Sequence, residues 1–266
     1  MSDINEKLAC SLTAETTQLL PYLPYLLQDL WELGSNPRDM IGLMKKHMPI
    51  SKGTKVLDLA CGKGAVSINI AKELGIHAHG FDLLPDFLDY ARTKANEMGV
   101  SALCHFSHGD VNEVVSTQKD YDCTIFGAAG NILGDPGETL AKLNRTVKPG
   151  GFILIDEAYL PDNAGGDNIK YQNYDYMYHS QWLQLFANNG LTLIEELRNI
   201  EDYDFDADNK AIAARAAELI AKHPEKREIF EGYVRSQLNE CEDLENNIIA
   251  VTWILQKEPN IDKLKK

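Results

Sequence analysis

The chain has 266 residues, 44% of them hydrophobic, so it can bury a sizeable core, and global disorder is excluded. Its formal net charge of −14 repels phosphate backbones and anionic lipid surfaces, which argues against nucleic-acid and membrane partners. Five cysteines without a C-x-x-C pair disfavour zinc and disulfide frameworks and favour a reducing, cytoplasmic location.

Residues 12–49 are predicted to be helical, because leucines recur at helical spacing from Leu19 to Leu30 and Asn36-Pro37 is typical of a helix start. Apolar strands then alternate with amphipathic helices, which predicts a parallel sheet covered on both faces. The predicted strands are 55–60, 77–81, 103–107, 121–126, 151–157, 191–198 and 247–256. The predicted helices are 65–74, 86–98, 137–147 and 179–189, with a helical pattern from Ile212 to Leu238 before the last strand.

The stretch Val56–Gly64 is the most informative part of the chain, because a strand there runs into a tight turn through Gly62 and Gly64. A helix follows at once, and the next strand ends in Asp82. An α/β protein holds a nucleoside with this order of elements, since glycines let the backbone approach the ligand and the distal acid accepts from the ribose hydroxyls. We therefore predict a nucleoside-binding site at this turn.

Two cofactors fit such a turn, and two residues discriminate between them. A dinucleotide fingerprint requires a third glycine, whereas Ser67 stands at that position. Asp58, inside the first strand, would repel a pyrophosphate but suits the amino group and the sulfonium of S-adenosylmethionine. S-adenosylmethionine is therefore the predicted cofactor, with a nicotinamide dinucleotide as the alternative.

The whole pattern resembles the class I S-adenosylmethionine-dependent methyltransferases over about residues 50–258. The resemblance implies an α/β, three-layer, Rossmann-like fold with helical lid elements. Its seven-stranded, mostly parallel sheet would have the order 3-2-1-4-5-7-6 and an antiparallel last strand. The motifs that carry it are Val56–Gly64, Gly80–Asp82, Gly109-Asp110, Tyr121–Phe126 and Leu143–Gly151, the last similar to the family's turn before its fifth strand.

The resemblance also implies roles for individual residues around the cofactor. The backbone of Ala60, Gly62 and Gly64 would wrap its methionine end. Asp58 would bind the amino group, and Asp82 would accept from both ribose hydroxyls. The remaining implied contacts are Leu83, Asp110 and Val111 at the adenine, and Gly127 and Ala128 near the methyl group.

The methyl acceptor is expected to be a small molecule. Amino-directed and cytosine-directed DNA methyltransferases carry proline-containing motifs after the fourth strand, and residues 127–133 match neither, in agreement with the acidic charge. Loops after the strands bind ligands in α/β proteins, so the tyrosine-rich segment after the fifth strand is a candidate acceptor site. The candidate substrate-binding residues are Trp31, Tyr174, Tyr178 and His179, although the same side chains would also suit packing against a lid. No catalytic residue is predicted, since the leaving group is already activated and a base is needed only for a protonated acceptor.

Five segments are predicted along the chain. They are an N-terminal helical lid (1–50), a cofactor-binding core (51–199), a helical insertion in the cap (200–246), the final core strand (247–258) and a basic tail (259–266). The acidic run Asp204–Asp208 lacks the glycine and glutamate of a calcium loop, so no metal is expected, and Asp208 or Asn209 is predicted to cap the next helix. The sequence indicates no oligomeric state.

Three functional hypotheses follow. The first is a methyltransferase that acts on a small molecule, the second a nicotinamide-dependent oxidoreductase, and the third a non-catalytic S-adenosylmethionine-binding protein. A predicted lid favours the enzymes over the binder, since a lid suits sequestered chemistry.

Overall fold

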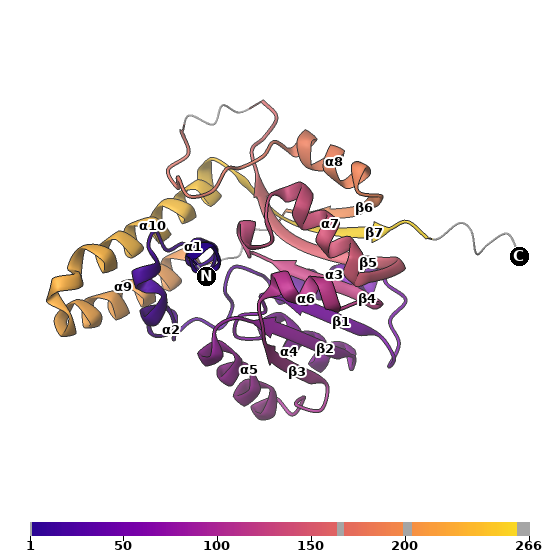
Figure 1. The fold of residues 1–266 in the computed structure, drawn as a ribbon, viewed down its shortest axis with the longest axis horizontal. Helices are drawn as coiled ribbons and strands as arrows, with labels where there is room; N and C mark the ends of the chain where they lie inside the picture. Colours follow the sequence, from indigo (N-terminus) through magenta and orange to yellow (C-terminus); the bar gives the residue numbers. More distant parts are fainter. Residues whose placement is uncertain (1, 164–167, 199–203, 260–266) are drawn as a thin grey trace, which may run out of the picture.

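The structure is a computed structural model that describes residues 2–163, 168–198 and 204–259. Over these residues a seven-stranded sheet with the order β3-β2-β1-β4-β5-β7-β6 forms the centre of the molecule (Figure 1). β7 runs antiparallel to both β5 and β6, and the other neighbouring strands pair in parallel, which confirms the predicted fold class and order. The strands are β1 (Lys55–Leu59), β2 (His77–Asp82), β3 (Cys104–His108), β4 (Tyr121–Gly127), β5 (Val147–Tyr159), β6 (Leu191–Leu197) and β7 (Ile249–Lys257).

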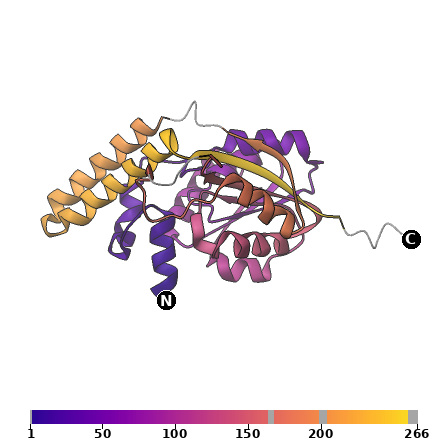
Figure 2. The same ribbon diagram turned by 90° about the horizontal axis from the view of Figure 1, so that it is seen from above.

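Helices cover both faces of the sheet, because successive strand side chains point to opposite sides. In β1, Val56 packs into the core on one face, while Leu57 and Leu59 pack into the core on the other. Figure 2 shows the sheet edge-on between its helical layers. On the face of Val56 lie α3 (Pro37–His47), α4 (Ala65–Leu74) and α5 (Pro85–Glu97), and on the other lie α6 (Val111–Thr117), α7 (Pro136–Thr146) and α8 (His179–Asn188).

The N-terminal segment differs from its prediction. A helix, α1 (Ser2–Ser11), precedes residue 12, and the leucine-rich run forms only the 3-10 helix η1 (Thr17–Tyr22) and the single turn α2 (Leu23–Leu26). Pro21 and Pro24 explain the short elements, because proline lacks the N–H that a longer helix needs. α3 does begin at Pro37, with the Asn36 side chain accepting from Arg38 N, as the sequence indicates.

Two further differences concern element boundaries in the core. α6 lies outside every predicted helix and begins beside Asp110, whose side chain accepts from Asn112 N. β5 is longer than the predicted strand, since the Pro149–Gly151 turn is absorbed as an irregularity in its pairing with β4. Gly150 has a φ of +76°, which glycine adopts at low cost.

A helical hairpin, α9 (Phe205–Lys222) and α10 (Arg227–Asn246), extends away from the sheet, joined by the short 3-10 helix η4 (Pro224–Lys226) (Figure 1). Leu219 and Phe230 of this hairpin pack with Leu19 and Leu23 of the N-terminal segment in a separate apolar cluster. The cap of α9 is Asp204, which corrects the predicted Asp208 or Asn209. Residues 200–203 of the predicted insertion and 260–266 of the predicted tail lie outside the described residues. In the described ranges no helix is long and apolar enough to span a bilayer.

Candidate cofactor and acceptor site

The turn after β1 takes left-handed backbone conformations at Ala60, Gly62 and Gly64, with φ of +55°, +53° and +72°. A Cβ on Gly64 would come within 2.8–2.9 Å of Phe106 and Ala91. Only glycine therefore lets the turn lie this close to β3 and α5. The turn leaves the backbone of Ala60 and Gly62 at the carboxyl end of β1, where α/β proteins bind ligands.

Asp58 is buried in β1 and faces α4, where its Oδ2 accepts a 2.6 Å hydrogen bond from Ser67 Oγ. Ser67, which stands where a dinucleotide-binding fingerprint has its third glycine, is thus the hydrogen-bond partner of Asp58. Burial raises the pKa of Asp58 to about 7, the Ser67 hydrogen bond lowers it, and Asp82 raises it further. A buried carboxylate of this kind stabilises a cation placed beside it.

Asp82 ends β2 and is also buried, with 7% of its surface exposed. Its Oδ2 accepts from Gly62 N at 2.8 Å, and its Oδ1 accepts from Leu84 N at 2.9 Å. Burial raises the pKa of this carboxyl, whereas the backbone hydrogen bonds lower it. Asp82 therefore fixes the turn after β1 against the end of β2.

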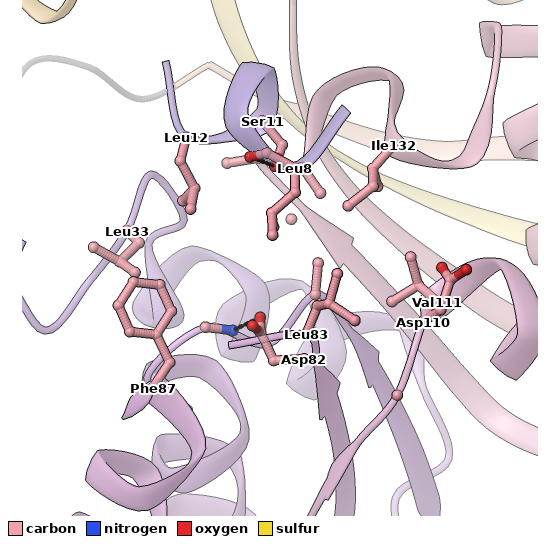
Figure 3. A pocket seen from close by; sticks show the side chains of 16 residues that line it. Leu8, Ser11, Leu12, Leu33, Asp82, Leu83, Phe87, Asp110, Val111 and Ile132 are labelled. Atoms are coloured by element: carbon pink, nitrogen blue, oxygen red, sulfur yellow. Dashed lines mark hydrogen bonds between the residues drawn. The ribbon is translucent and has the colours of Figure 1, made fainter. Parts of the chain in front are cut away.

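Two cavities meet at this turn, and Figure 3 shows the larger one from close by. The space inside them, open solvent included, is about 550 and 370 Å³. Of the predicted cofactor-binding residues, only Gly64 is absent from both linings. The shared wall is Leu33, Ala60, Gly62 and Gly127; the larger cavity adds Asp82, Leu83, Asp110, Val111 and Ala128, and the smaller adds Trp31, Ser35, Asp58 and Lys63.

A segment that we call the strap, residues 27–36, crosses over this site. Leu33 lines both cavities and so stands between them. A Cβ on Gly34 would lie 2.7 Å from the Cβ of Ala128, and Ser35 Oγ lies against Gly127. The strap is thus in contact with the turn after β4.

Lys63, in the glycine turn, holds the strap. Its Nζ donates to Leu27 O and Leu30 O, both at 2.5 Å, and Trp31 Nε1 donates back to Lys63 O at 3.2 Å. Burial lowers the pKa of Lys63 to about 8. The ion pair of Asp29 with Arg215 of α9 joins the strap to the helical hairpin, at 2.6 Å.

The four predicted substrate-binding residues do not form one site in this structure. Trp31 lines the smaller cavity beside Lys63. Tyr174 donates to both carboxylate oxygens of Glu157. Tyr178 packs beside Leu160 and Ile248, and His179 Nε2 lies 2.7 Å from Glu196 Oε2. Their role in acceptor binding stays a prediction.

Sequence reasoning missed several lining residues, because they come from segments far from the motif. Leu8 and Ser11 of α1, and Leu12 directly after it, cover the larger cavity from above (Figure 3). Phe87 of α5 and Ile132, after β4, complete the lining on two sides. Within the described residues, no group of three or more His, Cys, Asp or Glu is arranged to hold a metal ion.

Comparison with known proteins agrees with this geometry. Residues 50–200 match the family model of the methyltransferase domain. "Uncharacterized protein YjhP" of Escherichia coli is 37% identical over 40% of this chain and 43% of its own length, and the demethylmenaquinone methyltransferase of Listeria welshimeri is 29% identical over 47% and 53%. The chain spans about half the length of these curated relatives.

Solved structures extend the comparison across the fold. The crystal structure of an S-adenosylmethionine-dependent methyltransferase from Geobacter sulfurreducens, in complex with S-adenosyl-L-homocysteine, superposes with a TM-score of 0.73. It is 22% identical and covers 90% of this chain and 98% of its own, so it supports the fold alone. Since the family model covers more than half of the 266 residues, the chain belongs to the methyltransferase-domain family, with the class I fold.

Proposed function

We propose that the chain binds S-adenosylmethionine across both cavities and transfers its methyl group to a small-molecule acceptor. The observation that carries this proposal is the placement of two buried acids, Asp58 and Asp82, on either side of the Gly62 backbone. One acid suits the ammonium of the methionine end, and the other suits ribose hydroxyls. Leu83 and Val111 offer an apolar surface to the adenine between them.

When bound, S-adenosylmethionine supplies a methyl group on an activated sulfur. The chain must then align the acceptor with that methyl group and exclude water. The strap and α1 suit the second task, since they cover the smaller and the larger cavity. We accordingly propose that residues 1–50 and 200–246 act as the lid and cap of the core formed by residues 51–199 and 247–258.

Titration of the full chain tests the cofactor. S-adenosylhomocysteine and NADH would be titrated calorimetrically under the same conditions. We expect micromolar-range or tighter binding of the first and no saturable heat from the second, because Asp58 opposes a pyrophosphate. The reverse result would refute the proposal and restore the oxidoreductase alternative.

Methyl transfer is tested by incubating the protein with methyl-labelled S-adenosylmethionine and a cell extract cleared of macromolecules. Label in a small molecule supports the proposed reaction. Cofactor binding without any labelled product would favour the non-catalytic binder. A matched incubation with DNA and RNA tests the expected absence of nucleic-acid substrates, and the cytoplasmic location likewise stays a prediction.

A further inference from the structure

Glu157 lies near the carboxyl end of β5, beside the wall of the larger cavity. Ile155 and Tyr159, two residues before and two residues after Glu157, belong to the core that also contains Ala129. Because side chains alternate along a strand, Glu157 projects from the same face of the sheet. Ala128 N donates to the carbonyl of the preceding residue, Asp156, at 3.3 Å. Ala128 and Ala129 both line the larger cavity, which sets Glu157 next to the turn after β4.

Tyr174 orients this carboxylate. Its hydroxyl donates to Glu157 Oε1 at 3.0 Å and Oε2 at 2.9 Å, and Ala158 N donates to Oε2 at 3.2 Å. The Tyr174 ring also lies against Gly130, where a Cβ would be 3.7 Å from Cε2. Glu157 and Tyr174 are both half-buried. The pair therefore joins β5 to the turn after β4.

The surroundings of Glu157 are aromatic and acidic. Burial raises the pKa of Glu157 to about 7, the Tyr174 hydrogen bond lowers it, and Asp156 raises it. Glu240 of α10 accepts a hydrogen bond from Thr13 Oγ1 at 2.6 Å. Burial raises the pKa of Glu240, and the nearby Asp243 raises it further. The titratable groups that interact with Glu157, Tyr174 and Tyr176 are Asp156 from the opposite face of β5, Cys10 from α1, and Glu240 and Asp243 from α10. Such a set stabilises a cation and disfavours an anion.

We propose that Glu157 is a catalytic residue that binds the methyl acceptor and takes its proton, and that the acceptor is an amine that is cationic when free. This proposal rests on the proposed function and adds the acceptor class. The ammonium gives one N–H proton to the Glu157 carboxylate, which frees the nitrogen lone pair. That pair forms the N–CH3 bond while the electrons of the S–CH3 bond stay on sulfur, and the Glu157 proton leaves to solvent. Tyr174 is a positioning residue that acts through Glu157.

A labelling experiment with the full chain tests the acceptor class. A metabolite extract is split on a cation exchanger into a retained, cationic fraction and a neutral and anionic flow-through, and each is incubated with methyl-labelled S-adenosylmethionine. We expect labelled products from the cationic fraction. Label only in the flow-through, or none from the cationic fraction while S-adenosylhomocysteine binds, would overturn the proposal. Failure of the wild type to bind S-adenosylhomocysteine would instead refute the proposed function.

Variants then test the residue. Glu157→Gln keeps an oxygen for the Tyr174 hydroxyl, so we expect unchanged affinity for S-adenosylhomocysteine and a loss of methyl transfer of about 10²- to 10⁴-fold, the usual worth of a general base. Glu157→Asp should recover part of the rate. The matched control is Glu242→Gln, because Glu242 is a surface acid of α10 that pairs with Lys170. This variant should leave the rate unchanged. Wild-type turnover by Glu157→Gln would overturn the assignment.

Two readouts separate catalysis from a structural role. With S-adenosylhomocysteine present, n-butylammonium should bind the wild type in calorimetry, while n-butanol, butyrate and the Glu157→Gln variant give no saturable heat. The wild-type rate should fall as the pH drops below about 7, because the base becomes protonated. Tyr174→Phe removes a hydrogen bond that lowers the pKa, so the profile should move to higher pH. Equal binding of the three probes, or an unmoved profile, would contradict the proposal.

Discussion

Replacement of Asp82 by alanine should weaken cofactor binding strongly without unfolding the protein. Both carboxylate oxygens accept from backbone N–H groups, of Gly62 and Leu84, which fixes the acid at the end of β2. Two charge-assisted hydrogen bonds to ribose hydroxyls would contribute about 1.5–3 kcal/mol each, together about 3–6 kcal/mol. Since about 1.4 kcal/mol is a factor of ten, the dissociation constant for S-adenosylhomocysteine should rise by about 10²- to 10⁴-fold.

The assay combines calorimetric titration with thermal unfolding of the ligand-free protein. The variant also leaves the N–H groups of Gly62 and Leu84 without their acceptor, so its unfolding temperature should fall by several degrees while the transition stays cooperative. Asp86→Ala removes an exposed acid four residues along the chain, in the first turn of α5, and serves as the control with unchanged affinity. Binding by the Asp82 variant within about threefold of wild type would refute the ribose assignment.

Three further predictions address the turn, the strand acid and the strap. Gly64→Ala should cost about 2–4 kcal/mol in chemical denaturation, because its Cβ would meet Phe106 at a positive φ; an unchanged midpoint would contradict the packing argument. The affinity for S-adenosylhomocysteine should fall about tenfold per pH unit below about 7 and level off above it, since Asp58 has its pKa raised to about 7 and must be ionised to bind an ammonium; a flat calorimetric profile would exclude this role. Lys63→Met should speed S-adenosylhomocysteine dissociation about tenfold or more in stopped-flow, as the strap loses a charged donor to two carbonyls, whereas the exposed Lys72→Met should not; equal rates would remove Lys63 as the strap's anchor.

The fold, and the gathering of the motif residues at one turn, were accessible to sequence reasoning because their signals are local. Strand and helix periods alternate along the core, and Asp58, Gly62 and Gly64 fall within one strand–turn–helix unit. Asp82 follows one element later and packs directly onto that unit through Gly62 N. A ligand site that is built from neighbouring elements of one repeating strand–helix pattern can be predicted from the sequence alone.

The cover of the site was not accessible in the same way, since long-range contacts build it. Lys63 looks like a turn residue in sequence, yet its ammonium reaches carbonyls of Leu27 and Leu30. α1 carries few apolar residues at helical spacing and is held by contacts with distant parts of the chain, such as the Cys10 thiol donating to Asn173 O. Hydrophobic periodicity identifies a helix that packs on one continuous core. α1 and the strap that Lys63 holds instead bridge the core and the hairpin.

The tyrosine-rich segment shows why closeness in sequence does not make a single site. Leu160 N donates to Met177 O at 2.9 Å, and His179 N donates to Leu160 O at 3.3 Å. These hydrogen bonds hold residues 177–179 against the extension of β5. This pairing directs His179 to Glu196, which also accepts from Trp253 Nε1 at 2.8 Å and is thereby satisfied. The residues before 177 curve back toward α1, which brings Tyr174 into contact with Glu157. Burial raises the pKa of Glu157 to about 7, as a general base requires, so we propose that the methyl acceptor lies beside Glu157 rather than beside Glu196.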